Sequence, residues 1–328
     1  MNYESILKEF KEKRILVVGD VMLDAYILGK VTRVSPEAPV PVVALDKKEN
    51  RIGGAGNVAL NLKNLGAYPI IASVVGTDPE GQILEELFKK RGISSEGLVK
   101  SDLRKTTVKT RVISSKQQLL RVDSEDTHPL SPEHQKVLFE RILNLVETGL
   151  DAIILEDYDK GVLNESNIQR IIEEADKRNI PVTADPKKAN FHSYNGLSLF
   201  KPNLKELKEG LNLDFNFENN LVAFEDSVNR LRKVLPHEIS LITLSEHGVY
   251  ICNDSEKYHI PAHKREITDV SGAGDTVIAV ATLCYIAGAP ISTIAEIANI
   301  AGGMVCEKPG VVSISIEKLK NEVSELLK

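Results

Sequence analysis

The sequence lacks the features that mark secreted, zinc-binding and membrane-spanning proteins. Its three cysteines, Cys252, Cys284 and Cys306, are widely spaced and form no CxxC pair, which argues against a disulfide framework and a zinc site. No apolar stretch reaches the ~18 residues that a membrane span requires. The charged opening segment "MNYESILKEFKEKR" is not a secretory signal. We therefore expect a cytoplasmic protein.

Several ligand-binding signatures are also missing. The formal net charge is −6, whereas a surface that binds nucleic acid needs a clustered basic face. The pattern GxxxxGK followed by Ser or Thr does not occur, so the chain is not a Walker-type nucleotide hydrolase. The seven histidines show no metal-ligand spacing such as HExxH, and we interpret them as structural or surface residues. Neither nucleic acid nor a membrane is an expected partner.

The sequence does contain a regular alternation of β-branched runs with helix-like stretches. One helical pattern covers 53–66 and is closed by Gly66 as a C-cap. The strand-like runs lie at 14–20, 68–76, 151–157, 180–186 and 240–248. This order predicts an α/β fold in which helices cover both faces of a mainly parallel sheet. No repeat or obvious linker is present, so we expect residues 1–328 to form a single domain.

Two stretches break this rhythm. Residues 39–51 and 106–122 alternate apolar and polar residues without an intervening helix. Such a pattern is typical of half-buried strands. We therefore expect a small group of antiparallel strands outside the main sheet.

The first glycine-rich segment, "GAGNVA" at 54–59, matches the GxGxxA form of a dinucleotide-binding fingerprint. That fingerprint needs a strand leading straight into it, yet the preceding "KKENRIG" is charged. Two interpretations remain. Small residues at this point allow close helix packing, or the backbone of Gly53 and Gly54 approaches a ligand while Asn57 supplies an amide.

The second segment, "GAGD" at 272–275, precedes a long apolar stretch. A glycine-rich turn at a helix start gathers free N–H groups and the positive end of the helix, which favours an anion. Asp275 could simply be an N-cap, but a cap does not require two glycines flanking an alanine. Alternatively, the turn holds a transferring phosphoryl group while Asp275 accepts a proton from the attacking hydroxyl.

The pairing of "GGAGN" with "DVSGAGDT" resembles the ribokinase-like, or PfkB, family of sugar kinases across essentially the whole chain. Four further segments look like the D-glycero-β-D-manno-heptose 7-phosphate kinases: "VSPEAPVPVV" (34–43), "QQLLRVD" (117–123), "EDYDKGVL" (156–163) and "ADPKK" (184–188). The resemblance implies a three-layer αβα sandwich. It also implies ATP-dependent phosphorylation of the anomeric hydroxyl of that heptose, on the route to ADP-heptose and lipopolysaccharide.

The resemblance further implies a β-sheet lid drawn from 26–50 and 105–123, with lid strands that often pair between subunits. The segment "PVPVVAL" has an apolar face that a second subunit could cover, so a homodimer is expected. Some relatives carry a fused nucleotidyltransferase with an HxGH motif. That motif is absent here, which predicts a stand-alone kinase with a separate nucleotidyltransferase in the pathway.

The resemblance also assigns roles to individual residues. Asp275 would be the general base, with Gly272, Ala273 and Gly274 forming the anion hole. The sugar-binding positions would be Asp20, Asp24, Gly53, Gly54 and Asn57. The nucleotide-binding positions would be Asp185, Lys187, Asn203, Ser245, Gly248 and Asn299. Candidates for the substrate phosphate, which calls for Arg or Lys, are Arg111, Arg121 and Lys160.

Asn203 and Glu206 match an NxxE motif that organises Mg²⁺, largely through water. Read alone, the same residues describe a helix start with an Asn cap. Asp20 and Asp24 likewise have a plain alternative as turn and cap residues.

Three residues depart from the heptose kinase pattern. Ser271 stands in place of a frequent Thr, Glu156 in place of Ser, and Asp159 in place of a small residue. Two extra carboxylates would repel a phosphorylated substrate unless they paired with Lys160 or turned away. The alternatives are therefore another PfkB kinase, acting on fructose 1-phosphate, ribose or a nucleoside, and a non-catalytic binding protein of the same fold.

Overall fold

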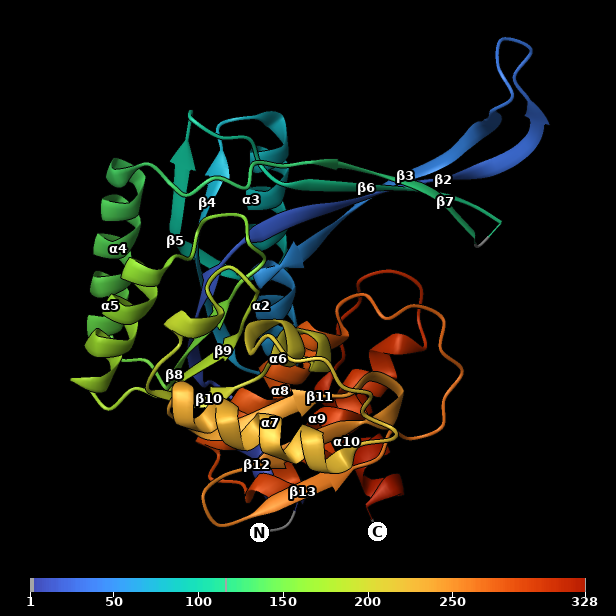
Figure 1. Cartoon of the computed structure of the whole chain (residues 1–328). Coiled ribbons are helices and arrows are strands. Elements are labelled where there is room, and N and C mark those ends of the chain that lie inside the picture. Colours follow the sequence, from blue (N-terminus) through green and yellow to red (C-terminus); the bar gives the residue numbers. More distant parts are fainter. Residues whose placement is uncertain (1–2, 116, 328) are drawn as a thin grey trace.

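The structure, a computed structural model, describes residues 3–115 and 117–327. Its main feature is a large sheet (Figure 1). The strands of this sheet are β1 (Arg14–Gly19), β4 (Tyr68–Gly76), β5 (Ser94–Ser101), β8 (Ala152–Glu156), β9 (Val182–Asp185), β10 (Leu197–Phe200), β11 (His237–Thr243), β12 (Val249–Cys252) and β13 (Lys257–Ile260). Within the described residues they follow the order β13-β12-β11-β10-β9-β8-β1-β4-β5. All pairs from β5 to β11 are parallel, and β12 and β13 add antiparallel pairs at one edge.

Helices cover both faces of the large sheet. One face carries α1 (Tyr3–Lys8), α2 (Ala55–Asn64), α3 (Pro79–Arg91), α8 (Ala273–Ile286), α9 (Ile291–Cys306) and α10 (Ile316–Leu326). The other face carries α4 (Pro132–Glu147), α5 (Glu165–Asp176), α6 (Leu204–Gly210) and α7 (Leu221–Val234). Two short 3₁₀ turns, η1 (Phe191–Ser193) and η2 (Ser245–His247), lie between elements.

The central strand β1 shows how the sequence produces these layers. Ile15 and Val17 belong to the core cluster on one face, whereas Leu16 and Val18 belong to the cluster on the other. Successive side chains of a strand point to opposite faces, so a continuous apolar run is buried on both sides. Each such side chain contributes about 1.5–3 kcal/mol of hydrophobic stabilisation. The predicted α/β fold with helices on both faces is confirmed.

Several elements of the large sheet did not stand out in the sequence. Strand β5 reads "SSEGLVKS", a polar run at the sheet edge, and β10 has only four residues. The predicted strand at 240–248 ends earlier, at Thr243, because η2 follows it. These differences leave the parallel order unchanged.

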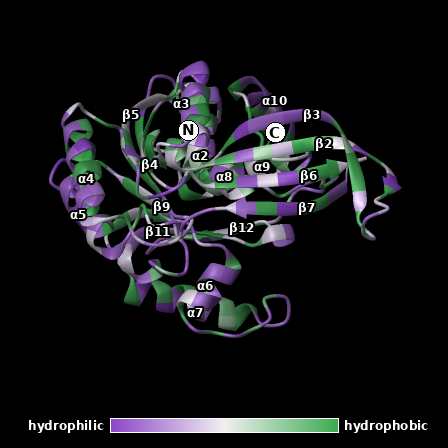
Figure 2. Cartoon of the chain, turned by 90° about the horizontal axis from the view of Figure 1, so that it is seen from above, coloured by the Kyte–Doolittle hydropathy of each residue, from purple (hydrophilic) through white to green (hydrophobic). Residues whose placement is uncertain are grey.

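A second, small sheet extends sideways from the body of the molecule (Figure 1). Its strands are β2 (Val21–Val34), β3 (Pro41–Gly54), β6 (Val108–Ser114) and β7 (Gln117–Ser124). In the described chain they lie in the order β3-β2-β6-β7. The outer pairs are antiparallel as expected, but the central pair, β2 with β6, is parallel. Figure 2 shows hydrophobic residues interspersed with hydrophilic ones along these strands.

Strand β3 runs directly into α2. The expectation that no strand precedes "GAGNVA" was therefore wrong. The segment is charged because β3 belongs to the exposed small sheet, where only its last three residues, 52–54, are buried. A dinucleotide fingerprint requires instead a buried strand of the main sheet, so the rejection of that motif stands.

None of the helices in residues 3–115 and 117–327 combines the length and the apolar character needed to cross a membrane.

At the start of β11, the imidazole of His237 is buried between the Leu235 carbonyl and the Ser240 hydroxyl. Burial lowers the pKa of His237 to about 4, below its ordinary value of about 6.5. The unfolded chain therefore binds the additional proton between these two values. The contribution of His237 to the unfolding free energy is therefore fully present above pH about 6.5, and it is lost as the pH falls toward 4.

We predict that the folded protein loses about 3 kcal/mol of unfolding free energy through His237 over this pH window. A His237→Gln variant should lack that part of the pH dependence. Urea unfolding of both proteins at about pH 7.5 and about pH 4.5 measures the difference. If the unfolding free energy of the two proteins fell equally between these pH values, His237 would not titrate in this way.

Candidate active site

The candidate site lies where the parallel strands of the large sheet end. Asp20 follows β1, Glu156 ends β8, Asp185 ends β9, and Asn203 and Ser245 follow β10 and β11. The carboxyl ends of parallel strands share one edge of a sheet, and ligands of open α/β sheets bind there. The polar residues singled out in the sequence are thus gathered by strand topology.

The N-terminus of α8 faces the same edge. Its N-cap is Gly272, with a φ of 79°, and no described side chain caps the helix. A Cβ on Gly272 would lie 2.8 Å from the Asn57 amide nitrogen, so both conformation and space require glycine. Asp275 is therefore not the N-cap. It sits in the first turn, and its carboxylate is free for another purpose.

Two hydrogen bonds hold the Asp275 carboxylate. Asn57 Nδ2 donates to Oδ2 at 2.7 Å, and the Tyr158 hydroxyl donates to Oδ1 at 2.6 Å. The side chain is 4% exposed. Burial raises the pKa of Asp275, while the hydrogen bonds from Tyr158 and Asn57 oppose that rise. A buried carboxylate with a raised pKa is suited to accepting a proton.

Two lysines and two carboxylates flank this turn. Lys201 Nζ lies 2.7 Å from Asp185 Oδ2, and Lys187 Nζ lies 2.6 Å from Glu206 Oε1. Lys201 is 2% exposed, and its ammonium is 3.5 Å from the position of a Cβ on Gly274. Burial alone would lower the pKa of Lys187, but Asp185 and Glu206 together raise it. Lys187 therefore stays charged, and the ion pair of Lys201 with Asp185 lies beside the start of α8.

Glu156 is the most unusual group in the site. It is 0% exposed, and neither carboxyl oxygen has a hydrogen-bond partner among the described residues. Strand register places it opposite Asp185. Burial, followed by the charges of Asp185 and Asp275, raises the pKa of Glu156 well above its ordinary value. Burial and these neighbouring carboxylates therefore disfavour the charged form of Glu156.

The other unexpected carboxylate, Asp159, adopts a φ of 54°. This left-handed conformation favours small or short polar residues. Its backbone N–H donates to Asp157 Oδ1 at 2.8 Å. Lys160 pairs with Glu125 at 2.8 Å rather than with either extra carboxylate, so the suggested pairing with Lys160 is corrected.

Asn203 and Glu206 form a capping box at the start of α6. Asn203 Oδ1 accepts from the Glu206 N–H, and Glu206 Oε2 accepts from the Asn203 N–H, each at 2.8 Å. This reciprocal pair satisfies two helix-end donors. The interpretation of "NLKE" as a capped helix start is therefore correct as local structure, whatever else these residues bind.

The two predicted sugar-binding aspartates already have partners inside the protein. Asp20 accepts from the backbone N–H groups of Tyr158, Lys160 and Val162. This fixes the loop that follows β8. The Asp24 carboxylate pairs with the buried Arg111 guanidinium. In this structure Asp20 thus organises the loop after β8, and Asp24 is held by an ion pair with β6.

Glycines bring the small sheet close to these aspartates. A Cβ on Gly53 would lie 2.1 Å from Asp24 Oδ2, so only glycine fits there. Gly54 is the N-cap of α2, which carries Asn57 toward Asp275. Close packing is therefore one real reason for "GGAGN".

The three basic candidates for a substrate phosphate are also paired. Arg111 on β6 contacts Asp24, and Arg121 on β7 contacts Asp123 at 2.8 Å. Arg111 and Arg121 face each other in the β6–β7 register. A phosphate at any of the three would have to compete with a carboxylate of the chain.

A cleft of about 1270 Å³ opens beside the start of α8. It brings together the predicted anion turn, the general base and the nucleotide-side residues. These lining residues are Gly272, Ala273, Gly274, Asp275, Asp185, Lys187, Asn203, Ser245, Gly248 and Asn299. Within the described chain, the residues predicted for the sugar and its phosphate lie outside this lining, beyond Tyr158 and Asp275.

Two residues of the cleft that bind its carboxylates, Tyr158 at Asp275 and Lys201 at Asp185, were missed from the sequence. Both lie in segments that drew notice for other residues, "EDYDKG" and "KPNLKEL". No local pattern marks either as functional, because Tyr158 contacts Asp275, 117 positions away, and Lys201 contacts Asp185 at the end of a neighbouring strand.

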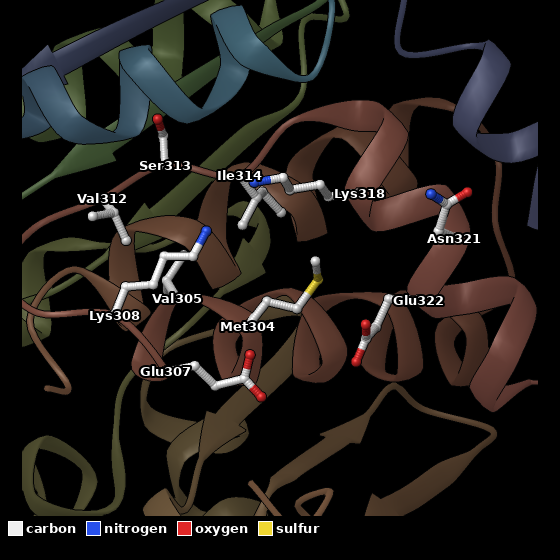
Figure 3. Close-up of a pocket in the computed structure, with 10 residues that line it drawn as sticks. All are labelled: Met304, Val305, Glu307, Lys308, Val312, Ser313, Ile314, Lys318, Asn321 and Glu322. Carbon is white, nitrogen blue, oxygen red and sulfur yellow. The ribbon is translucent and has the colours of Figure 1, made fainter. Parts of the chain in front are cut away.

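A smaller hollow of about 280 Å³ lies between α9 and α10 (Figure 3). Lys308 and Lys318 line it, together with Glu307 and Glu322. Arg265 pairs with both glutamates. The described lining of this hollow includes neither Asp275 nor the residues that contact it. The large cleft is therefore the candidate active site.

The sequence matches the pfkB family carbohydrate kinases over residues 12–319. It is 41% identical over 309 residues to the "Bifunctional protein HldE" of Methylobacillus flagellatus, covering 94% of this chain and 63% of that protein. The corresponding HldE of Helicobacter pylori strain J99 is 38% identical over 307 residues, covering 94% and 65%. This chain belongs to the pfkB family. It spans slightly less than two thirds of the length of these curated relatives.

Solved structures show the same fold. Escherichia coli phosphofructokinase-2 in complex with potassium aligns with a TM-score of 0.79 at 17% identity, covering 97% of this chain and all of that one. Arabidopsis thaliana ribokinase complexed with ribose and ATP aligns with a TM-score of 0.70 at 15% identity, covering 95% and 99%. The fold is ribokinase-like, and the protein is an ATP-dependent carbohydrate kinase. The alternative of a non-catalytic binding protein is set aside.

Proposed function

We propose that this kinase phosphorylates the anomeric hydroxyl of D-glycero-β-D-manno-heptose 7-phosphate, giving the 1,7-bisphosphate in the synthesis of ADP-heptose for lipopolysaccharide. The observation that carries the phosphoryl-transfer chemistry is the buried Asp275 carboxylate at the open N-terminus of α8. The heptose is supported by about 40% identity to relatives named HldE and by the four heptose-kinase segments of the sequence. The runner-up is a PfkB kinase for fructose 1-phosphate, ribose or a nucleoside.

In the proposed reaction, Asp275 accepts the proton of the anomeric hydroxyl as that oxygen bonds to the γ-phosphorus. The bond between the γ-phosphorus and the β–γ bridging oxygen breaks, and ADP leaves with its electron pair. The amides at Gly272 to Gly274 face the charge that develops on the phosphoryl oxygens, and Lys201 lies beside them. Phosphoryl transfer depends mostly on such positioning and charge stabilisation.

Mg²⁺ would accompany ATP. Among the described residues, no group of three or more His, Cys, Asp or Glu side chains could enclose a metal. Mg²⁺ keeps several waters and needs only one or two carboxylates plus phosphates. Asp185 Oδ1 is buried and has no hydrogen-bond partner in the described chain, although Lys187 Nζ lies 3.7 Å away, so the donor set fits an ion held mostly through water. We assign it to Asn203 and Glu206, where it would neutralise phosphate charge.

The acceptor would enter from the side of the small sheet. This approach to Asp275 is surrounded by Asp24, Gly53, Gly54 and Asn57. Asp20 fixes the neighbouring loop that follows β8. We propose that the 7-phosphate draws Arg111, Arg121 or Lys160 away from its present carboxylate. Because burial raises the pKa of Glu156, its charged form, which would repel a phosphorylated acceptor, is disfavoured.

Replacing Asp275 with Asn should lower kcat by about 10²–10⁴, the usual contribution of a general base. The amide keeps the shape and accepts a hydrogen bond but cannot take the proton. ATP binding, measured by calorimetry, should change little, because the α8 amides and Lys201 remain. A D275N protein with near-normal turnover would remove Asp275 from this role.

The acceptor is tested by ADP release with Mg·ATP. The panel contains heptose 7-phosphate, fructose 1-phosphate, fructose 6-phosphate, ribose and adenosine. We expect a strong preference in kcat/KM for the heptose, because that site would be built around its phosphate and hydroxyls. Preference for another sugar would leave the kinase assignment intact and overturn the heptose proposal.

The small sheet is proposed to act as a lid and to pair with a second subunit. Several large apolar side chains on it are exposed: Val31, Val34, Val40, Leu45, Leu120 and Val122. Exposed apolar strands of this kind are normally covered. Light scattering should give about twice 36.1 kDa, and a Leu45→Lys, Val122→Lys protein should shift toward the monomer. Particles of 36.1 kDa alone would contradict the dimer.

A further inference from the structure

The Tyr158 hydroxyl occupies one oxygen of the proposed catalytic carboxylate, Asp275. It donates to Asp275 Oδ1 at 2.6 Å, while Asn57 holds Oδ2. An acceptor hydroxyl giving its proton to Asp275 would need the same kind of contact, at about 2.6–3.2 Å. Tyr158 therefore makes the hydrogen bond that a sugar hydroxyl makes at the moment of reaction.

The backbone of Tyr158 is fixed. Its N–H and those of Lys160 and Val162 bind Asp20. The preceding Asp157 is fully buried and is held by the Tyr194 hydroxyl and the Asn190 amide. Because the main chain cannot follow a moving ligand, any displacement of the hydroxyl must come from rotation of the side chain.

The ring of Tyr158 stands between the two halves of the site. It lines the nucleotide cleft, and the Lys187 ammonium lies 5.4 Å from the ring centroid. Its hydroxyl reaches Asp275, which also binds Asn57 of the proposed sugar approach. Tyr158 is thus the one described residue that both lines the nucleotide cleft and donates to the general base.

We propose that Tyr158 blocks ATP hydrolysis in the absence of sugar. Its hydroxyl fills the position at Asp275 from which a water molecule would otherwise attack the γ-phosphorus. Water is the competing nucleophile of every kinase, and its exclusion is a known use of closing segments. Sugar binding displaces the hydroxyl and replaces it with the acceptor hydroxyl. This inference rests on the proposed role of Asp275 but not on the identity of the sugar.

The hydrolysis that Tyr158 blocks is balanced without another reactant. A water oxygen bonds to the γ-phosphorus, and the bond from that phosphorus to the ADP oxygen breaks. The water proton passes to Asp275, and phosphate and ADP are released. Only ATP and water are consumed.

The test is ATP hydrolysis by the intact chain with Mg·ATP and no sugar. Tyr158→Phe keeps the ring and removes only the hydroxyl. We expect hydrolysis to rise by about tenfold or more, since assistance by a general base is worth roughly 10²–10⁴-fold. With an accepted sugar present, ADP formed should exceed sugar phosphate formed, whereas the parent protein gives a ratio near unity.

Tyr194→Phe is the matched control. It also removes a tyrosine hydroxyl bound to an aspartate of the same loop, at 2.8 Å, but it does not touch Asp275. Its hydrolysis should match that of the parent protein. In the double variant Tyr158→Phe, Asp275→Asn, the additional hydrolysis should disappear.

Three results would overturn the proposal. Unchanged hydrolysis in Tyr158→Phe, even with a fall in sugar-dependent kcat, would show that the hydroxyl positions Asp275 rather than blocks it. An equal rise in Tyr194→Phe would attribute hydrolysis to a loosened loop. Hydrolysis that persists in the double variant would show that it bypasses Asp275. By contrast, normal sugar phosphorylation by Asp275→Asn alone would contradict the proposed base itself.

Discussion

The Asp275 carboxylate is the point at which three remote parts of the chain meet. Asn57 on α2 and Tyr158 in the loop after β8 both donate to it, and α8 places it at the open edge of the sheet. These partners are 218 and 117 positions away in sequence. Joining them requires the parallel sheet to be correctly ordered. The burial of the Asp275 carboxylate in the first turn of the apolar helix α8 is therefore compensated by hydrogen bonds only in the complete fold.

Around this group, the protein balances charge rather than avoiding it. Asp185 and Glu206 are paired with Lys201 and Lys187, since an unpaired buried charge is strongly destabilising. Glu156 is the exception: its carboxyl oxygens have no hydrogen-bond partner among the described residues, and burial raises its pKa, which disfavours the charged form. The edge of the sheet can thus receive a highly charged nucleotide without collecting excess negative charge of its own.

Much of this arrangement could be predicted from local patterns. The buried strands and the "GAGD" turn are marked by β-branched runs and glycines, and strand ends gather by topology alone. What could not be predicted depends on distant contacts. Tyr158 and Lys201 acquire their places only when β8, β9, β10 and α8 pack together. Sequence patterns suggest ligand-binding roles for Asn203, Glu206 and Asp20. In the structure these residues also make hydrogen bonds that hold local structure, the capping box of α6 and the loop after β8.

The most direct test is a crystal structure with heptose 7-phosphate and a non-hydrolysable ATP analogue. The account predicts the anomeric oxygen within about 2.6–3.2 Å of the Asp275 carboxylate. It also predicts the γ-phosphate against the first turn of α8 and the Tyr158 hydroxyl moved away from Oδ1. A sugar bound with its hydroxyl far from Asp275, or with the Tyr158 hydrogen bond intact between them, would contradict it.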